Sequence, residues 1–419
     1  MPPTTSINNH GAGSQNVATG NGPQFNNKGA GTQSSYYKST DKKIPKAFIG
    51  DLKPSQGHET EELSSSHTRP SRREDFQIAL ICALPLEYDA VALLFDQFWD
   101  EDGVQYGRAR GDTNTYTTGR IGNYNVVLAL LPNMGKAAAA GTAASFRSSY
   151  PRLKLALLVG ICGGVPGTGA KEILLGDVVI SKTVIQYDLG RQFPNKFVTK
   201  NTVDDSLGRA NRDIRSLVAS FETELGRERL QKKASEYLKD LQGAAVHKKR
   251  VNTYNYLGVA EDKLFTVAYQ HKHRSPKQCG MCQGENDSYC KEAAQASCVE
   301  LKCDERQLVS RERLTTKQGL DLGDMQCPDI FIGRMASGDT VLKSGTHRDQ
   351  LAEQLDVIAF EMEGAGVWDE LPCIVIKGVC DYADSHKNKK WQPFAAATAA
   401  SVMKAALGRY TLTDDLRFE

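Results

Sequence analysis

The chain has 419 residues, of which 40% are hydrophobic and 24% charged, and its formal net charge is +2. This composition is typical of a soluble globular protein, and the small net charge argues against nucleic acid or an anionic membrane surface as the main partner. The sequence has no apolar run long enough to span a bilayer and no secretory leader at Met1–Ser6, so we expect a cytoplasmic protein.

Residues 1–73 are poor in apolar side chains and rich in Gly, Asn, Gln, Ser and Thr, which predicts a disordered tail. Within this tail, residues 8–15 (NNHGAGSQ) recur as residues 26–33 (NNKGAGTQ). Asn and Gln side chains form ladders in cross-β stacks, and the repeat resembles the amyloid-forming signalling motifs of filamentous fungi. That resemblance implies an NLR-type receptor as a partner. A flexible low-complexity leader is the alternative.

Residues 75–409 alternate between apolar runs typical of buried strands and segments with a helical pattern. This alternation predicts an α/β fold, a three-layer sandwich with a mostly parallel mixed central sheet. We expect helices from residue 86, over 136–148 and over 394–407, and strands at 76–84, 124–131, 155–164, 177–181, 330–333, 357–361 and 373–379.

A change of pattern between residues 204 and 326 predicts a largely helical insertion into this α/β domain. The insertion begins with a charged helical stretch at 211–242, continues through a segment rich in Cys and His, and ends in a second charged helix near 305–318. Residues 410–419 are expected to form a short C-terminal tail.

Polar groups follow three of the predicted strands, in the segments Ser337–Val341, Phe360–Gly366 and Lys377–Asp384. The carboxyl ends of strands are where open α/β sheets bind ligands. With these segments the chain resembles the nucleoside phosphorylase and nucleosidase superfamily, in particular its purine-specific branch. The resemblance implies the family's fold and a site that cleaves a purine N-ribosidic bond.

The same resemblance assigns roles to individual residues. It implies that Asp381 is the acid facing the purine N7, that Glu363 accepts hydrogen bonds from the ribose hydroxyls, and that Glu87 activates water. The alternatives are that Asp381 caps a helix and that Glu87 is an ordinary acid in a first helical turn. Further substrate-binding residues are implied at Gly160, Cys162, Ser337, Asp339, Val341, Phe360, Met362, Lys377 and Cys380. Lys377 and Cys380 stand where the family has arginine and serine.

Two glycine-rich loops bear on whether water or phosphate is the nucleophile. In the family's phosphorylases, arginines and a serine in these loops bind phosphate, but residues 84–86 and 158–161 of this chain contain neither. We therefore expect hydrolysis without a catalytic cofactor. Two alternatives stay open: Lys136 could rebuild a phosphate site and make the protein a phosphorylase, or the domain could bind a nucleotide for signalling without turnover.

Residues 257–265, 269–273 and 381–391 most resemble the phosphorylase-like domains of fungal NLR-like immune proteins. That resemblance implies an adenine nucleotide as the substrate, with ATP preferred, a homo-oligomer, and an immune or cell-death role. A triphosphate requires cationic partners. The candidates for phosphate binding are His271, Lys272, His273, Arg274, Lys343, Arg348, His386 and Lys387.

Cysteines gather in the predicted insertion. Cys279 and Cys282 have the spacing of a zinc knuckle, and Cys290 and Cys298 follow. These four thiols form a candidate structural zinc site in which His271 or His273 could replace one cysteine. Free thiols without metal are the alternative.

Overall fold

The computed structural model describes residues 69–103, 105–167, 171–194, 196–200, 202–275, 279, 281–283 and 289–412, which belong to one compact unit. The repeats of the predicted N-terminal tail lie outside the described residues, as does most of the predicted C-terminal tail. In the part that is described, no helix combines the length and the apolar character needed to cross a membrane.

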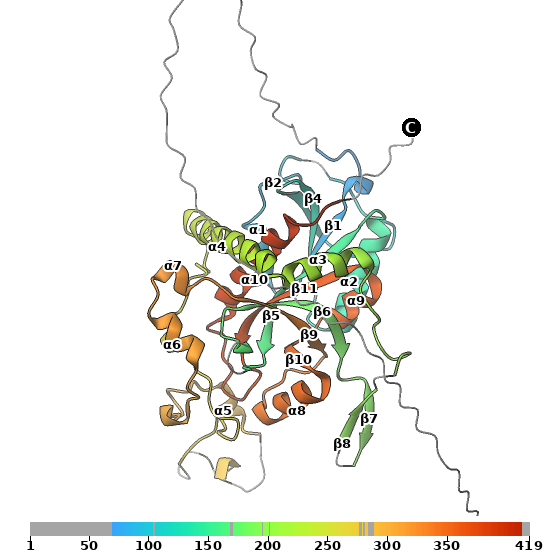
Figure 1. Cartoon of the computed structure of the whole chain (residues 1–419). Coiled ribbons are helices and arrows are strands. Elements are labelled where there is room, and N and C mark those ends of the chain that lie inside the picture. Colours follow the sequence, from blue (N-terminus) through green and yellow to red (C-terminus); the bar gives the residue numbers. More distant parts are fainter. Residues whose placement is uncertain are drawn as a thin grey trace, which may run out of the picture. The chain divides into compact units, whose positions relative to one another are not determined.

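A central sheet of nine strands organises the fold, in the spatial order β10-β9-β6-β11-β5-β1-β4-β3-β2 (Figure 1). Its strands are β1 (Ile78–Cys82), β2 (Gln97–Phe98), β3 (Tyr116–Ile121), β4 (Tyr124–Leu130), β5 (Leu155–Gly164), β6 (Val178–Gln186), β9 (Ile330–Ser337), β10 (Val357–Glu361) and β11 (Cys373–Asp381). A separate hairpin of β7 (Gly190–Phe193) and β8 (Lys196–Thr199) projects away from this sheet.

The sheet is mixed and partly closed. Strand β10 pairs with β9 on one side and, at Ala359 and Phe360, with the end of β5 on the other, so β5, β11, β6, β9 and β10 curl into a barrel-like half. Five of the strand pairings are parallel and four are antiparallel. The predicted α/β class with a mixed central sheet is confirmed. The closure was not predicted; register shifts at Ser181/Thr183 and Val379/Asp381 accompany the bending, as bulges bend strands.

Helices cover the sheet on both sides. On one side α10 lies against β5 and β11, beneath α1 and α4, while α2 packs with α9 on the other. Because α10 is rich in alanine, it approaches the sheet closely: a side chain at Gly378 would meet the Ala395 carbonyl oxygen at 2.0 Å. The helices are α1 (Pro85–Ala92), α2 (Lys136–Ser149), α3 (Arg212–Glu222), α4 (Glu224–His247), α5 (Lys291–Gln295), α6 (Glu312–Gln318), α7 (Leu322–Met325), α8 (Gly345–Leu355), α9 (Gly364–Glu370) and α10 (Gln392–Leu407).

The charged stretch predicted at the start of the insertion forms two helices and belongs to the core. The helical conformation is interrupted at Thr223, whose hydroxyl accepts a hydrogen bond from the Gly226 amide at 3.0 Å and so caps α4. The buried face of α4 joins the main hydrophobic core through Leu230, Ala234, Leu238, Leu241 and Ala245. The described residues after α4, up to β9, form loops with the short helices α5, α6 and α7.

Candidate active site

Four buried side chains from separate parts of the chain meet beside the carboxyl ends of the central strands. Glu87 comes from the first turn of α1, Glu361 ends β10, Glu363 immediately precedes α9, and Lys377 lies within β11. The Lys377 ammonium lies 2.9 Å from Glu363 Oε2 and 3.8 Å from Glu361 Oε2, and its residue has no solvent exposure. The arrangement holds more buried carboxylates than cations.

Glu87 is fixed by three backbone amides. Its Oε2 accepts hydrogen bonds from Ala83 and Leu84 at 2.9 Å each, and its Oε1 accepts one from Ile161 at 2.8 Å. Burial raises the pKa of Glu87, and the nearby Lys377 ammonium opposes that rise. A carboxylate held in this way is oriented by the backbone and has a higher proton affinity than an exposed glutamate.

The absence of a side chain at Gly160 leaves space for the Glu87 carboxylate. A methyl group at this position of β5 would meet Glu87 Oε1 at 2.3 Å. We therefore expect Gly160→Ala to displace the carboxylate and to lower catalytic turnover about 100-fold, the scale of a misplacement of about 1 Å. Measured turnover beside thermal stability tests this expectation. The matched control is Gly141→Ala, where α2 leaves open space around the new methyl group and helix stability should rise by about 1 kcal/mol. Unchanged turnover in Gly160→Ala would contradict it.

Glu361 was ranked below Glu363 from the sequence and was not among the predicted substrate-binding residues. Its carboxylate accepts hydrogen bonds from the backbone amides of Glu363, at 3.0 Å, and of Gly364, at 2.8 Å, and thereby anchors the start of α9. Burial raises the pKa of Glu361, with Lys377 again opposing. The sequence signal was a glutamate two residues before Glu363, at the end of a buried strand. The Glu361 side chain points to the start of α9 and holds Glu363 in place.

The cation at the centre of this cluster is held in its charged form. Burial alone would lower the pKa of Lys377, but Glu363, Glu87 and Glu361 together raise it above its usual value. Lys377 was predicted to contact substrate. In the structure its ammonium donates to Glu363 Oε2 at 2.9 Å and so holds that carboxylate in place.

Asp381 ends β11 and is buried with three close partners. Its Oδ1 accepts a hydrogen bond from the Ala383 amide at 2.9 Å, and its Oδ2 lies 3.0 Å from Lys387 Nζ and 3.3 Å from Cys380 Sγ. A side chain at Gly163 would meet Asp381 Oδ1 at 3.0 Å. Glu87 and Asp381 thus approach β5 three residues apart, or about 10 Å along the strand.

The other predicted substrate-binding residues lie near this edge but differ in exposure. Ser337 is buried and accepts a hydrogen bond from the Ala365 amide at 2.9 Å, and Phe360 meets Tyr187 edge-on at 5.8 Å between ring centres. Cys162 and Cys380 are buried, Met362 is half-buried, and Val341 and Asp339 are exposed.

Lys136, which could have rebuilt a phosphate site, already has acidic partners. Its ammonium pairs with Asp188 and lies 3.8 Å from Asp339, while its backbone amide donates to Asp339 Oδ1 at 2.8 Å. Asp339, predicted to bind substrate, therefore caps the start of α2. This arrangement argues against a free cation for phosphate at that loop.

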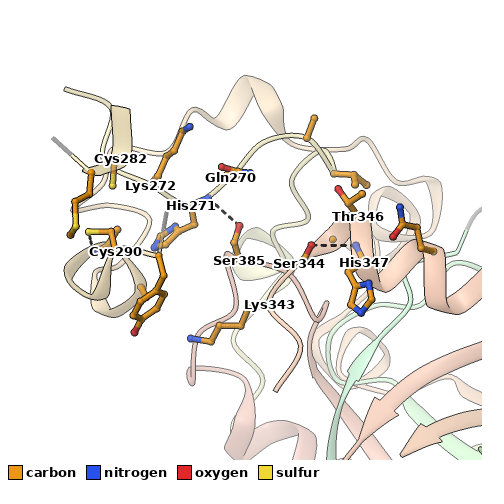
Figure 2. A pocket seen from close by; sticks show the side chains of 18 residues that line it. Gln270, His271, Lys272, Cys282, Cys290, Lys343, Ser344, Thr346, His347 and Ser385 are labelled. Atoms are coloured by element: carbon orange, nitrogen blue, oxygen red, sulfur yellow. Dashed lines mark hydrogen bonds between the residues drawn. The ribbon is translucent and has the colours of Figure 1, made fainter. Parts of the chain in front are cut away.

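A cavity of about 590 Å³ lies between the described residues after α4 and the start of α8. Figure 2 shows His271 joined to Ser385 by a hydrogen bond, with Lys272, Lys343, Ser344 and His347 around the same space. Neither this cavity nor a second one of about 320 Å³ is lined by Glu87, Glu363 or Asp381. The larger cavity is therefore a neighbour of the carboxylates and does not contain them.

The eight predicted phosphate-binding residues lie in several different surroundings. Lys272 and Lys343 line the cavity. Arg348 is buried and donates to the Tyr382 carbonyl oxygen at 2.8 Å, and Arg274 lies 4.0 Å from the centre of the Tyr269 ring. Lys387 pairs with Asp381, and the three histidines face cysteine sulfurs. For most of the set, protein groups already occupy the polar atoms expected to meet phosphate.

The four thiols predicted to form one zinc site do not come together. Cys279, Cys282 and Cys290 lie with His273, whereas Cys298 lies with Cys303, His271 and His386. The sequence offered both histidines as substitutes but could not show that Cys298 belongs to a different group. The pairing depends on how residues 271–303 fold against the segment after β11.

Comparison with known proteins agrees with the motifs described above. Residues 77–248 match the model of the phosphorylase superfamily, a match that extends from β1 to the end of α4. The predicted resemblance is thereby confirmed over these residues.

A nucleotide-binding leucine-rich repeat (NLR)-like protein of Hyaloscypha variabilis is 29% identical over 350 residues, which cover 82% of this chain. The matched region spans 30% of that relative's length.

Several solved structures have a similar course of the backbone. The 5′-methylthioadenosine/S-adenosylhomocysteine nucleosidase of Colwellia psychrerythraea, in complex with adenine, matches with a TM-score of 0.46 at 16% identity, covering 81% of this chain and 98% of that one. The futalosine hydrolase of Helicobacter pylori matches with a TM-score of 0.43 at 15% identity, covering 80% and 98%. Likeness of this degree carries no conclusion about chemistry, which has to come from the residues themselves.

Proposed function

We propose that this protein hydrolyses the N-ribosidic bond of an adenine nucleoside or nucleotide and releases adenine. The observation that carries the proposal is a set of three buried carboxylates at the carboxyl ends of the central strands: Glu87 and Glu363 lie around Lys377, and Asp381 ends the strand that carries Lys377. Pure binding of a nucleotide has no need of so many buried carboxylates, whose desolvation is costly. That cost favours catalysis over a non-catalytic signalling module.

Each carboxylate has a distinct task in this reaction. Asp381 faces the purine and delivers a proton or hydrogen bond to N7, so that the base leaves as a neutral species. Glu363 accepts hydrogen bonds from the ribose hydroxyls and stabilises the positive charge that grows on the sugar. Glu87 takes a proton from the attacking water. Lys387, beside Asp381, is the nearest cation to the proton-donating group.

Water is the proposed nucleophile because the phosphate-binding parts are missing from the places where they are needed. The loop before α1 and strand β5 present Leu84 and Gly160 with a carboxylate between them, which repels inorganic phosphate. Lys136 is neutralised by Asp188. A phosphate-dependent phosphorylase remains the second candidate, and its requirement for added phosphate distinguishes it.

A nucleotide, with ATP preferred, is proposed over a nucleoside because of the cavity beside the site. Lys272 and Lys343 line it, and the N-terminus of α8 opens onto it at Ser344. Ammonium groups and a helix N-terminus both favour phosphate groups. Ser385, four residues after Asp381, lies on the same wall. A nucleotide whose base lies at Asp381 would therefore direct its phosphates toward this cavity.

Adenine release tests the proposal directly. Purified protein is incubated with adenosine, AMP, ADP or ATP, with and without inorganic phosphate, and free adenine is measured by chromatography. We expect adenine without added phosphate and faster release from ATP than from adenosine. No adenine from any of the substrates would refute hydrolysis, and release that depends on phosphate would establish the phosphorylase.

The pH dependence of the reaction should report the protonation of Glu87. Because burial raises its pKa, Glu87 gains a proton at a higher pH than an exposed glutamate, whose pKa is about 4.3. Protonated Glu87 cannot accept a proton from water. On the acid side, kcat/KM should therefore begin to fall at a pH above the pKa of an exposed glutamate. A profile of kcat/KM against pH measures this limb. Glu87→Gln should lower kcat/KM by about 100-fold or more, while the exposed control Glu353→Gln should leave the profile unchanged.

The wider role is proposed as an immune or cell-death effector that acts as a homo-oligomer in the cytoplasm. Its support is the similarity to an NLR-like protein and the repeat in residues 8–33, through which an NLR-type receptor could recruit the chain. Fibre formation by a peptide of residues 1–40 would support recruitment through this motif, whereas a peptide that stays monomeric would leave a linker.

A further inference from the structure

Two groups of cysteine and histidine are formed by the described part of residues 271–303 together with His386, and neither takes part in the proposed reaction. The distal cluster consists of His273, Cys279, Cys282 and Cys290, and the loop cluster consists of His271, Cys298, Cys303 and His386. In each cluster the four ligand atoms lie within 4.8 Å of one another. Each set of two or three thiols with imidazole is a ligand set that suits zinc.

The spacing of these atoms fits a tetrahedrally coordinated zinc ion. Bonds of about 2.3 Å to sulfur and about 2.0 Å to nitrogen place tetrahedral ligand atoms about 3.3–3.8 Å apart. In the loop cluster, His271 Nδ1 lies 3.6 Å from Cys298 Sγ and 3.5 Å from Cys303 Sγ, and His386 Nδ1 lies 3.6 Å from Cys298 Sγ.

The distal cluster has similar spacing. His273 Nδ1 lies 3.4 Å from Cys282 Sγ and 3.8 Å from Cys290 Sγ, and the sulfurs of Cys279 and Cys290 are 3.8 Å apart. The Cys290 sulfur also accepts a hydrogen bond from the Ala293 amide at 3.4 Å, the kind of contact that stabilises a metal-bound thiolate.

The histidines of the loop cluster are oriented as metal ligands usually are. His271 Nε2 lies 2.9 Å from the Ala296 carbonyl oxygen, and His386 Nε2 lies 2.8 Å from the Tyr269 carbonyl oxygen. A carbonyl oxygen can only accept, so each Nε2 carries the proton and each Nδ1 turns its lone pair toward the thiols. Histidines bound to metals characteristically donate their other N–H in this way.

His386 connects the loop cluster to the candidate active site. It stands five residues after Asp381, with its ring stacked on Phe265 at 4.0 Å, and the next residue, Lys387, pairs with Asp381 at 3.0 Å. On the other side, the His271 amide donates to Ser385 Oγ at 3.0 Å. The cluster therefore joins residues far apart in sequence just beyond the acid.

We propose that this protein binds two zinc ions, one in each cluster, and that the ion of the loop cluster fastens residues 271–303 to the segment after β11. In this arrangement His386 is a positioning residue: through the backbone it keeps Lys387 beside Asp381. The positioning role rests on the proposed hydrolysis, whereas the two metal sites do not.

Elemental analysis of the full chain, purified from zinc-containing medium, tests the metal sites. We expect two zinc ions per chain. His386→Ala should lower the count by one, His386→Cys should retain both, and Cys282→Ser with Cys290→Ser should remove the other ion. The matched controls are His247→Ala, which changes an exposed histidine at the end of α4, and Cys327→Ser, whose thiol lies outside both clusters. Neither should change the zinc content.

Cobalt gives a second measurement that does not depend on activity. Protein reconstituted with Co²⁺ should show thiolate-to-cobalt charge-transfer bands and the intense visible bands of tetrahedral coordination, both reduced in His386→Ala. A folded parent chain free of zinc and cobalt would overturn the proposal. So would a mass lower by two hydrogens with Cys298 and Cys303 joined as a disulfide.

Adenine release then separates the positioning role from the metal sites. If His386→Ala loses one zinc and at least tenfold in kcat, while His386→Cys and His247→Ala keep the zinc content and the kcat of the parent, the positioning role is supported. Loss of zinc with unchanged kcat would overturn the positioning role and leave the metal site standing. If the parent releases no adenine, the proposed hydrolysis fails, while the zinc count still decides the metal sites.

Discussion

Asp381→Asn should lower adenine release about 100- to 10,000-fold, the range that a positioned acid contributes. The amide retains the shape of the side chain and its acceptor for the Ala383 amide, which lies 2.9 Å from Asp381 Oδ1. It cannot supply the acidic proton, and it no longer pairs with Lys387. Chromatography of free adenine under saturating ATP measures the effect.

The control for this substitution is Asp356→Asn at the end of α8. Asp356 is exposed and adopts a left-handed backbone conformation, with φ of 52°, which asparagine tolerates well. We expect its activity and thermal stability to match those of the parent. Equal activity in Asp381→Asn and the parent would remove Asp381 from the mechanism, provided that both proteins are folded.

Sequence pattern predicted the strands that are buried on both sides. The apolar runs at β1, β4, β5, β10 and β11 were all found within a few residues of their bounds. Burial on both faces leaves no polar position in such a strand, so the pattern is continuous and its ends are clear. The two small strands of the β7–β8 hairpin carry mostly exposed side chains and were missed for the opposite reason.

The predicted insertion shows where local pattern fails. The stretch that became α3 and α4 is highly charged, which favoured a separate helical unit. Yet one apolar stripe on α4, beginning at Leu230, packs into the main core. A single stripe is enough for a helix to join a core, because only one face needs to be apolar. The many charged residues on the exposed face of α4 made its apolar stripe hard to recognise in the sequence.

The candidate site was predicted as a set of separate motifs, and the structure adds what lies between them. Glu87, Glu363 and Asp381 were each identified from a motif, but the position of Lys377 against Glu363 depends on contacts between β11 and α9. The ion pair of Lys387 with Asp381 likewise needed the fold of the loop after β11. Such long-range contacts leave no periodic signal in the sequence.

Lys377→Met should lower the free energy of unfolding by about 3–5 kcal/mol at neutral pH, the cost of leaving a buried charge without its partner. The substitution retains much of the side-chain volume but removes the only ammonium facing Glu87, Glu361 and Glu363 in the described structure. Equilibrium unfolding in urea measures the loss. Lys390→Met is the control, since its ion pair with Glu261 is largely exposed and should contribute less than about 1 kcal/mol.

The pH dependence of this loss distinguishes a charge effect from a packing effect. Lys377 opposes the burial that raises the pKa of Glu87 and Glu361, so its removal should raise both values further. Groups whose pKa is raised by folding stabilise the fold in their protonated form, below the pKa of the unfolded chain, and that contribution is lost as the pH rises. The deficit of Lys377→Met should therefore be small in acid and grow toward neutral pH. The double variant Lys377→Met with Glu363→Gln should recover part of it, because one uncompensated carboxylate is gone. A deficit that is the same at every pH would mean that lost packing, and not buried charge, sets the stability of this site.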